Sequence, residues 1–422
     1  MSVIDIAKLR QRASALPVAA LAPVREAAVR ALTETGLPTT RDEHFKYTDL
    51  GEISALSERW LADTPESKPS PAADAWLDQL GRDTDIEWIV VRNGRATETS
   101  LTVDGVSLRP LSESAVAPEI ATPLAALNAA LLEDGLLLDI ERTPERPIGL
   151  VFVDDAETAP GIAPCRVAIR VADNARAEIV EYYASFGDEA HYSNAFLTLD
   201  LAQGAGVKHA RIQDRGRAHS QTQNLRVTLG RDAEFRSAAF DFGGKLSRND
   251  LFVDLPERGA HAEFNGLYLA GEGQHVDNHT RVDHRVGPAT SRQQYRGILS
   301  GRTRAVWNGK ALVYEGADGT DAEQSNHNLL LSDNAEIDTK PELEIYAEDV
   351  RCSHGTTVGQ LDEKALFYLR SRGISAEDAH RLLVNAFAAS TLDMLPVAAI
   401  GEHLTALLEQ RLRDLLRKRD TE

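Results

Sequence analysis

The chain contains two cysteines, and one of them, Cys352, stands two residues before His354. Just before this pair, Leu343 and Ile345 alternate with charged residues, a pattern that predicts a half-buried strand with Cys352 at its end. Residues i and i+2 of an extended backbone point to the same face. We therefore expect a thiol and an imidazole side by side on one surface. From the residues alone, a buried cysteine at a strand end and a turn histidine with no ligand role are the favoured interpretation, and a pair of metal ligands is the alternative.

The cysteine count limits what this pair can do alone. A structural zinc ion or an iron–sulfur cluster needs about four ligands. The second cysteine, Cys165, lies in PGIAPCRVAI, after a proline-containing turn and before an expected strand, and we interpret it as structural. The chain therefore cannot supply a four-thiolate site. Two distant cysteines also favour a reducing compartment over a disulfide scaffold, so we expect a cytoplasmic protein.

A second group of metal-binding residue types lies in HVDNHTRVDH, which contains His275, Asp277, His279, Asp283 and His284. Imidazoles and carboxylates together can chelate a metal ion. The segment reads as strand and loop, however, and we expect no geometry that places three of these side chains on one face. Structural hydrogen bonding within the core is our interpretation, with a metal site as the alternative.

Composition and missing motifs exclude several functions. The net charge of −19 opposes binding to nucleic acids and anionic membranes, so neither is an expected partner. No run of about 18 apolar residues predicts a membrane span, and the N-terminus does not resemble a secretory signal. The sequence lacks a GxxxxGK[ST] loop, a GxSxG elbow, HExxH and CxxC. We therefore expect neither a nucleotide-hydrolysing enzyme nor one of these hydrolases.

The first third of the chain reads as mostly helical with short strands. Helical spacing over residues 1 to about 62 is interrupted by prolines, and a Pro/Ser-rich linker follows at 64–71. A short strand is expected at 86–91 and a helix at 123–134, ended by Gly135. We assign residues 1–145 to this N-terminal region.

From about residue 148 to 350 the sequence instead shows short alternating runs with an irregular repeat. A pair of turn-forming residues followed by alanine recurs, four times at intervals of roughly 28 residues and once more after a longer interval. The five alanines are Ala175, Ala205, Ala233, Ala260 and Ala335. Gly, Asn and Asp suit bends that need a positive φ, and alanine suits a tight inner corner.

Such a period with strand content predicts stacked rungs, that is, a parallel β-solenoid. A β-sandwich is the alternative, but its turns follow one another more closely. We place the solenoid core at residues 146–358 and a helical C-terminal subdomain at 359–422. We expect a break at Gly-Thr-Thr-Val-Gly (355–359), a helix at 361–370, a helix capped by Ser375, and a last helix from about residue 397 to 419.

The run EIYAEDVRCSHGTTVGQLDEKALFYLRSRGI at 344–374 closely resembles the C-terminal hallmark of the SufB/SufD family, the scaffold subunits of the SUF iron–sulfur cluster assembly system. The segment DEHFKYTDL at 42–50 also resembles a family segment, with Phe45 where tryptophan is usual. We expect Phe45 to anchor a helical arm onto the core. The resemblance covers nearly the whole chain and implies a right-handed parallel β-helix core with helical subdomains at both ends.

The resemblance also implies a function. It predicts a non-catalytic scaffold, not an enzyme, that pairs with a SufB-type paralogue and docks a SufC-type ABC ATPase. His354 first, and Cys352 second, would belong to a site shared with the partner subunit, where a transient iron–sulfur cluster forms. We expect no cofactor bound stably by the isolated chain. Its unpaired solenoid end makes a homodimer the alternative in isolation.

Docking of the ATPase is expected on the C-terminal helical part, and ordinary helix packing is the competing interpretation. The candidate residues are Tyr368, Arg370, Arg372 and Phe387. Length and cysteine count favour a D-type member of the family over the B-type, which is longer and richer in cysteine. The remaining alternatives are a polysaccharide-acting β-helix enzyme and a stand-alone metal-binding protein.

Overall fold

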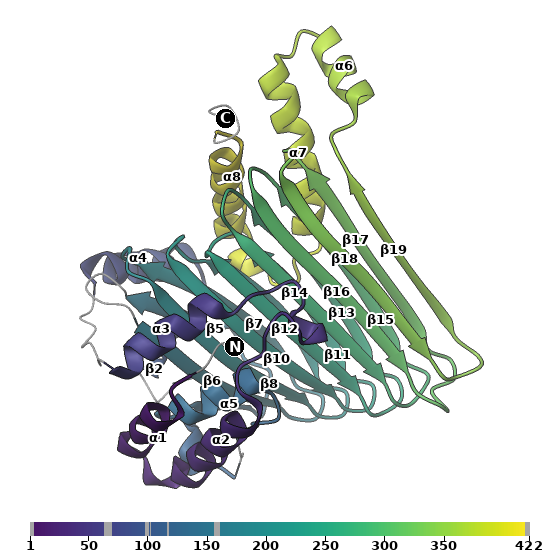
Figure 1. Cartoon of the computed structure of the whole chain (residues 1–422). Coiled ribbons are helices and arrows are strands. Elements are labelled where there is room, and N and C mark those ends of the chain that lie inside the picture. Colours follow the sequence, from purple (N-terminus) through teal and green to yellow (C-terminus); the bar gives the residue numbers. More distant parts are fainter. Residues whose placement is uncertain are drawn as a thin grey trace.

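Two parallel sheets that face each other dominate the computed structural model, which describes residues 4–62, 70–97, 101, 103–115, 118–155 and 161–417 (Figure 1). Successive strands alternate between the sheets, so the chain winds through about 7 turns of a β-solenoid. Helical regions stand at both ends of the chain. The prediction of a mainly β solenoid with helical ends is confirmed.

Each sheet is a ladder of in-register strands within the described residues. Sheet A has the order β19-β17-β15-β13-β11-β9-β7-β5-β1-β2, with β1 Glu87–Arg92, β2 Arg95–Ala96, β5 Ile148–Asp155, β7 Arg176–Phe186, β9 Gly206–Asp214, β11 Glu234–Asp241, β13 His261–Ala270, β15 Thr290–Leu299, β17 Asp321–Leu330 and β19 Arg351–Gly359. Sheet B has the order β18-β16-β14-β12-β10-β8-β6-β4-β3, with β3 Val106–Pro110, β4 Leu136–Ile140, β6 Gly161–Val171, β8 His191–Leu201, β10 His219–Leu229, β12 Leu246–Leu255, β14 His275–His284, β16 Thr303–Val313 and β18 Ala335–Ile345.

The repeated turns have the predicted chemistry. The second residue of each of the first four turn pairs has a positive φ, in the order Asn174, Gly204, Asp232 and Gly259. The alanine that follows each of them is buried before a strand of sheet A. Ala335 does not continue this column, because it begins β18 in sheet B. Ala289 and then Thr320 take the next two positions, each accepting a hydrogen bond from the following rung.

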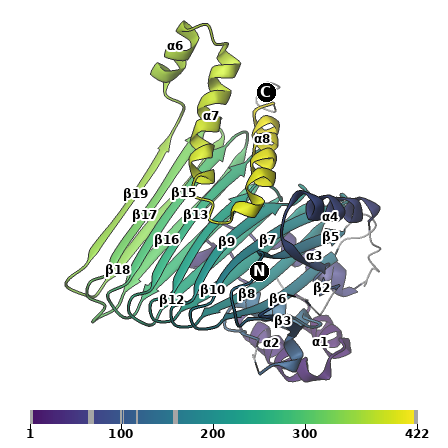
Figure 2. The same ribbon diagram turned by 180° about the vertical axis from the view of Figure 1, so that it is seen from behind.

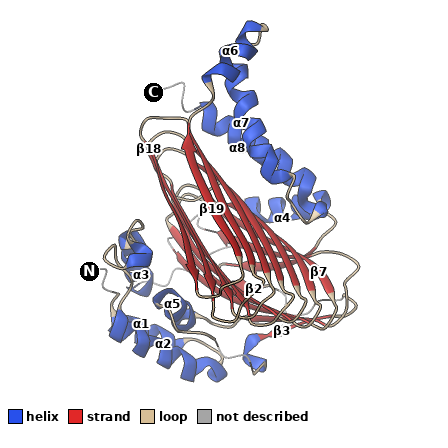
Figure 3. Cartoon of the chain, turned by 90° about the vertical axis from the view of Figure 1, so that its right-hand side faces the viewer, coloured by secondary structure: helices blue, strands red, loops and turns tan. Residues whose placement is uncertain are grey.

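Helices cover the outer faces of both sheets (Figure 3). The N-terminal helices α1, α2, α3 and α5 lie on the side of sheet B, whereas α4, α7 and α8 lie on the side of sheet A. Their bounds are α1 Ile6–Ala15, α2 Ala22–Thr35, α3 Gly51–Ala62, α4 Pro71–Asp83, α5 Pro123–Leu131, α6 Glu363–Ser371, α7 Ala376–Leu392 and α8 Gly401–Arg417, with short 3-10 turns at Ala19–Leu21, Glu43–Phe45, Leu111–Glu113 and Ala398–Ile400. None of the helices in these described stretches is long and apolar enough to cross a membrane.

The arm that links α2 to α3 binds the outer face of sheet B. The Arg248 guanidinium stacks over the Phe45 ring, 4.4 Å from its centroid, and donates a hydrogen bond of 2.7 Å to the His44 carbonyl. The Thr48 hydroxyl donates to the Asp277 carboxylate at 2.5 Å. The prediction that Phe45 anchors this arm to the core is confirmed.

The expected break at residues 355–359 is wrong. Strand β19 continues through Gly355 to Gly359, and a Cβ at either glycine would meet no atom within 4 Å. The glycines are therefore not required by a tight turn. The helix that follows begins at Glu363, because the Asp362 side chain caps the Lys364 amide. The predicted cap at Ser375 is confirmed, since its hydroxyl accepts from the Asp378 amide at 3.1 Å.

Candidate functional site

The two ends of the solenoid differ in how they finish. At the first end, each sheet terminates in a short antiparallel strand, β2 on sheet A and β3 on sheet B. At the other end, β18 and β19 each have a neighbour on one side, and no described strand pairs with their outer edges (Figure 1). We call this the open end. The chain leaves it through α6, and α7 and α8 then pack on β13 and β15 of sheet A.

Cys352 and His354 lie on β19, at the open end. Cys352 pairs in register with Ala322 and His354 with Gln324 of β17. Ala322 and Gln324 are both 1% exposed and face the interior between the sheets, so Cys352 and His354 occupy the last inward-facing positions of the same columns. Cys352 is partly buried and His354 is exposed. The structure therefore brings the two side chains onto one surface at the mouth of the solenoid.

The backbone of β19 is oriented for pairing with a further strand. The Arg351 amide donates to the Thr320 carbonyl at 2.9 Å, back toward the preceding rung. Because successive residues of a strand direct their amides to opposite sides, the amides of Cys352 and His354 face the free edge. On β18 the corresponding edge position at Pro341 has no N–H to donate. Of the two free edges, β19 therefore offers the more complete set of donors.

The Cys352 thiol is not preactivated. Burial raises its pKa, the nearby Asp321 carboxylate raises it further, and a hydrogen bond with the Ala322 backbone acts in the opposite direction. The thiol therefore stays protonated at neutral pH until a metal or a positively charged neighbour displaces the proton. No three histidine, cysteine or carboxylate side chains come together as a metal site within the described residues. The two side chains alone are thus fewer than the about four ligands that a zinc ion or a cluster needs.

Cys165 lies far from this pair along the solenoid, on β6. It is 6% exposed and belongs to the apolar interior. Burial raises its pKa strongly, with smaller contributions from Asp154 and Glu181. This environment agrees with its interpretation as a structural residue.

The second histidine-rich segment forms β14. His275, Asp277 and His279 do share its outer face at i+2 spacing, so the expectation that no geometry would align them is wrong. They are occupied by protein partners: Asp277 accepts from Arg248 at 2.6 Å and pairs with His279 at 2.9 Å. His275 is 2.9 Å from the Thr48 hydroxyl. On the inner face, His284 is bonded to Ser291 at 2.9 Å. Structural hydrogen bonding describes this segment.

The structure separates Phe387 from the other three residues considered for ATPase docking. Tyr368 is 58% exposed on α6, with the Arg372 guanidinium 5.3 Å from its ring centroid, and Arg370 is exposed nearby. Phe387 instead packs toward sheet A, with the Arg296 guanidinium 4.9 Å from its ring. Sequence reasoning missed Phe367, which is 74% exposed beside Tyr368. Its only signal was an aromatic residue on a short helix that buries nothing.

Comparison with known proteins decides the family. A model described as "SUF system FeS cluster assembly, SufBD core domain" matches residues 152–387, which run from within β5 through the rest of the solenoid, the open end and α6. The iron–sulfur cluster assembly protein SufD of Escherichia coli K12 is 30% identical over 406 residues, covering 92% of this chain and 93% of that protein. The chain belongs to the SufB/SufD family.

Other members of the SufB/SufD family agree. A SufBD family protein of Synechocystis is 30% identical over 413 residues, covering 90% of this chain and 88% of that protein. SufD of Bacillus subtilis is 26% identical over 297 residues, or 69% of this chain and 67% of that protein. Family membership supports a role in iron–sulfur cluster assembly by the SUF system.

Proposed function

We propose that this SufB/SufD-family chain is a non-catalytic scaffold subunit that pairs, through its open end, with a SufB-type paralogue in the cytoplasm. The observation that carries the proposal is the unpaired edge of β19 with Cys352 and His354 on its inner face. A strand edge with free amides favours association with another strand. Pairing at this edge would bury the two side chains beside ligands from the partner.

The ligand chemistry supports a shared and transient site. A thiol and an imidazole are two of the about four protein ligands that a cluster requires, so the partner must supply the rest. The cluster is cargo in this proposal, and the isolated chain binds none stably. An imidazole ligand exchanges more readily than a thiolate, which suits release of the product. We assign His354 the leading role and Cys352 the supporting one.

The helical hairpin of α6 and α7 is the proposed contact for a SufC-type ABC ATPase. Tyr368, Arg370 and Arg372 are exposed on or just after α6, next to the more exposed Phe367. An aromatic pair flanked by arginines is the composition that interface centres favour. Phe387 packs α7 onto β15 and so holds the base of this hairpin against sheet A.

The alternatives have less support. The relatives named above are assembly proteins, and no polysaccharide-acting enzyme is among them. The E. coli relative is of the D type, and the presence of two cysteines in this chain also favours the D type over the B type. The homodimer would use the same β19 edge and is therefore a competing state of the isolated chain.

The test is affinity purification of the full chain from its native cell, with the partners identified by mass and the iron and sulfide of the complex measured. We expect a SufB-type and a SufC-type protein to co-purify. His354→Ala should leave the complex intact and lower its cluster content about fivefold or more, since one ligand of about four is removed.

His261→Ala is the matched control, because His261 lies on the outer face of β13, away from the open end. It should leave both the partners and the cluster content unchanged. Undiminished cluster content in the His354→Ala complex would remove this residue from the proposed site, and the absence of both partners would refute the scaffold assignment.

A further inference from the structure

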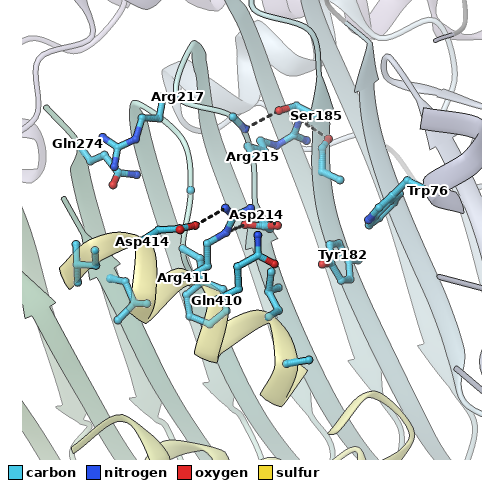
Figure 4. A pocket seen from close by; sticks show the side chains of 18 of the residues that line it. Trp76, Tyr182, Ser185, Asp214, Arg215, Arg217, Gln274, Gln410, Arg411 and Asp414 are labelled. Atoms are coloured by element: carbon cyan, nitrogen blue, oxygen red, sulfur yellow. Dashed lines mark hydrogen bonds and ion pairs between the residues drawn. The ribbon is translucent and has the colours of Figure 1, made fainter. Parts of the chain in front are cut away.

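A cavity of about 840 Å³ lies on the outer face of sheet A, far from the open end and between the two terminal helical regions (Figure 4). Its floor is formed by β7, β9, β13 and the residues that follow β11, one wall by α8, and the other by Trp76 of α4. Figure 2 shows α4 and α8 on this side of the solenoid. This volume is typical of small-molecule sites. Cys352, His354 and the exposed residues of α6 do not line it, so the proposed scaffold function leaves it unexplained.

One end of the cavity is aromatic. The Trp76 ring meets Tyr182 edge-on with centroids 5.1 Å apart and lies 5.7 Å from Phe186. The Tyr182 hydroxyl is fixed by a hydrogen bond of 3.1 Å with the His403 ring. These rings are held in place by two elements from opposite ends of the chain. They form a preorganised apolar wall against which a flat ring can stack.

The rest of the cavity lining has more arginines than carboxylates, although the protein as a whole carries −19. Four arginines line the cavity, Arg215, Arg217, Arg411 and Arg417, against the two aspartates Asp214 and Asp414. Arg411 forms a bidentate pair with Asp214 at 2.6 and 2.8 Å, and Arg215 is paired with Asp154 in the interior. These two charges are therefore neutralised within the protein.

Arg217 differs from them. Its Nη1 donates to the Glu272 backbone carbonyl at 2.5 Å, and no carboxylate of the described residues forms a salt bridge with it. Its Nη2 lies at the rim, where a Cβ on Gly271 would meet it at 3.1 Å beside Leu415. Figure 4 shows Arg217 and Trp76 on opposite sides of the cavity. A guanidinium held by one nitrogen has its other donors free for an acidic group.

We propose that this cavity binds a small organic anion that carries an aromatic ring. The ring would stack in the Trp76 and Phe186 wall while a carboxylate or similar acidic group pairs with Arg217. Because α4 and α8 both line the cavity, the ligand would tie the N-terminal and C-terminal regions together on one face of the solenoid. It would therefore raise the thermal stability of the chain as well as bind to it.

Isothermal titration calorimetry of the full chain with 2-naphthoate tests the proposal, with the neutral 2-naphthalenemethanol and inorganic phosphate as comparison probes. We expect one saturable site for 2-naphthoate and binding about tenfold or more weaker for each comparison probe, since each lacks half of the recognised chemistry. Arg217→Gln should weaken 2-naphthoate about fivefold or more. Saturating 2-naphthoate should also raise the melting temperature of the wild type.

Arg236→Gln is the matched control, because Arg236 is an exposed arginine in a separate, mixed-charge groove of sheet A. Its affinity for 2-naphthoate should equal that of the wild type. Three results would overturn the proposal: equal affinity of the Arg217→Gln variant, equal affinity for the neutral alcohol or for phosphate, or no saturable heat up to about 5 mM 2-naphthoate. A circular dichroism spectrum confirms that Arg217→Gln is folded.

Discussion

His209 and His354 occupy the same inward-facing column of sheet A, five rungs apart, yet their surroundings differ completely. Register links them through Ser237, Phe264, Gln293 and Gln324. His209 is 2% exposed and is bonded to Glu181 at 2.9 Å and to Ser237 at 2.8 Å. His354 is exposed, because no further rung follows β19. A position that is buried and hydrogen-bonded within the solenoid is thus exposed to solvent at its end.

The largest expected effect is a difference in the free energy of unfolding between alanine variants of these two histidines. His209 and Tyr183 hold the pKa of Glu181 below its usual value although burial alone would raise it. His209→Ala leaves that carboxylate buried without its main partner, and we expect the free energy of unfolding to fall by about 3–5 kcal/mol. His354→Ala should change it by less than about 0.5 kcal/mol. Urea denaturation measures both, and similar losses would show that the open end is not exposed.

Acid should destabilise the chain by protonating the histidines buried in its interior. Burial lowers the pKa of His219 to about 4, while Asp154, which would favour protonation, is paired with Arg215. The unfolded chain then binds more protons than the folded one between about pH 6.5 and 4, so this part of the stability is fully present above pH 6.5 and is lost as the pH falls to 4. We expect His219→Gln to remove about 3 kcal/mol of that pH dependence. A melting profile against pH with the wild-type slope would contradict this.

A smaller effect should distinguish the two sides of β19. Thr356→Pro removes an amide that faces the free edge, so the fold should tolerate it while association through that edge weakens about tenfold. Thr357→Pro is the matched control, since its amide faces β17 and its loss should destabilise the chain itself. Analytical ultracentrifugation and thermal melting separate these outcomes. Equal association by the Thr356→Pro variant would show that partners do not pair with β19.

Much of this architecture was accessible from the sequence, because it depends on local rules. The turn pairs ending at Asn174, Gly204, Asp232 and Gly259 carry their conformational requirement in their own residue types. The Ser375 cap and the Phe45 anchor likewise follow from short segments. The adjacency of Cys352 and His354 needed only the period of a strand.

The errors share a cause, which is that register joins residues about 30 apart and local patterns do not reveal it. Ala335 has the right turn residues but lies in the other sheet. The His275 to His284 segment is one continuous strand that aligns its odd-numbered residues, and its own sequence carries no apolar alternation that indicates this. The glycines after His354 suggested a turn, although a free edge strand tolerates them because no neighbouring side chain packs against them. Glu181 and His209 could be paired only once both strands were placed.

The short strands β2 and β3 have a consequence for the number of chains in the proposed assembly. A ladder with a long parallel edge at each end would add copies indefinitely and grow into a fibre, whereas here the two sheets finish at one end in antiparallel strands of two and five residues. If the open end pairs with the open end of a solenoid of the same design, the long unpaired edges of both chains are covered. Growth by the proposed pairing would then stop at two chains, and the stoichiometry of that assembly would depend on seven residues at the opposite end of the molecule.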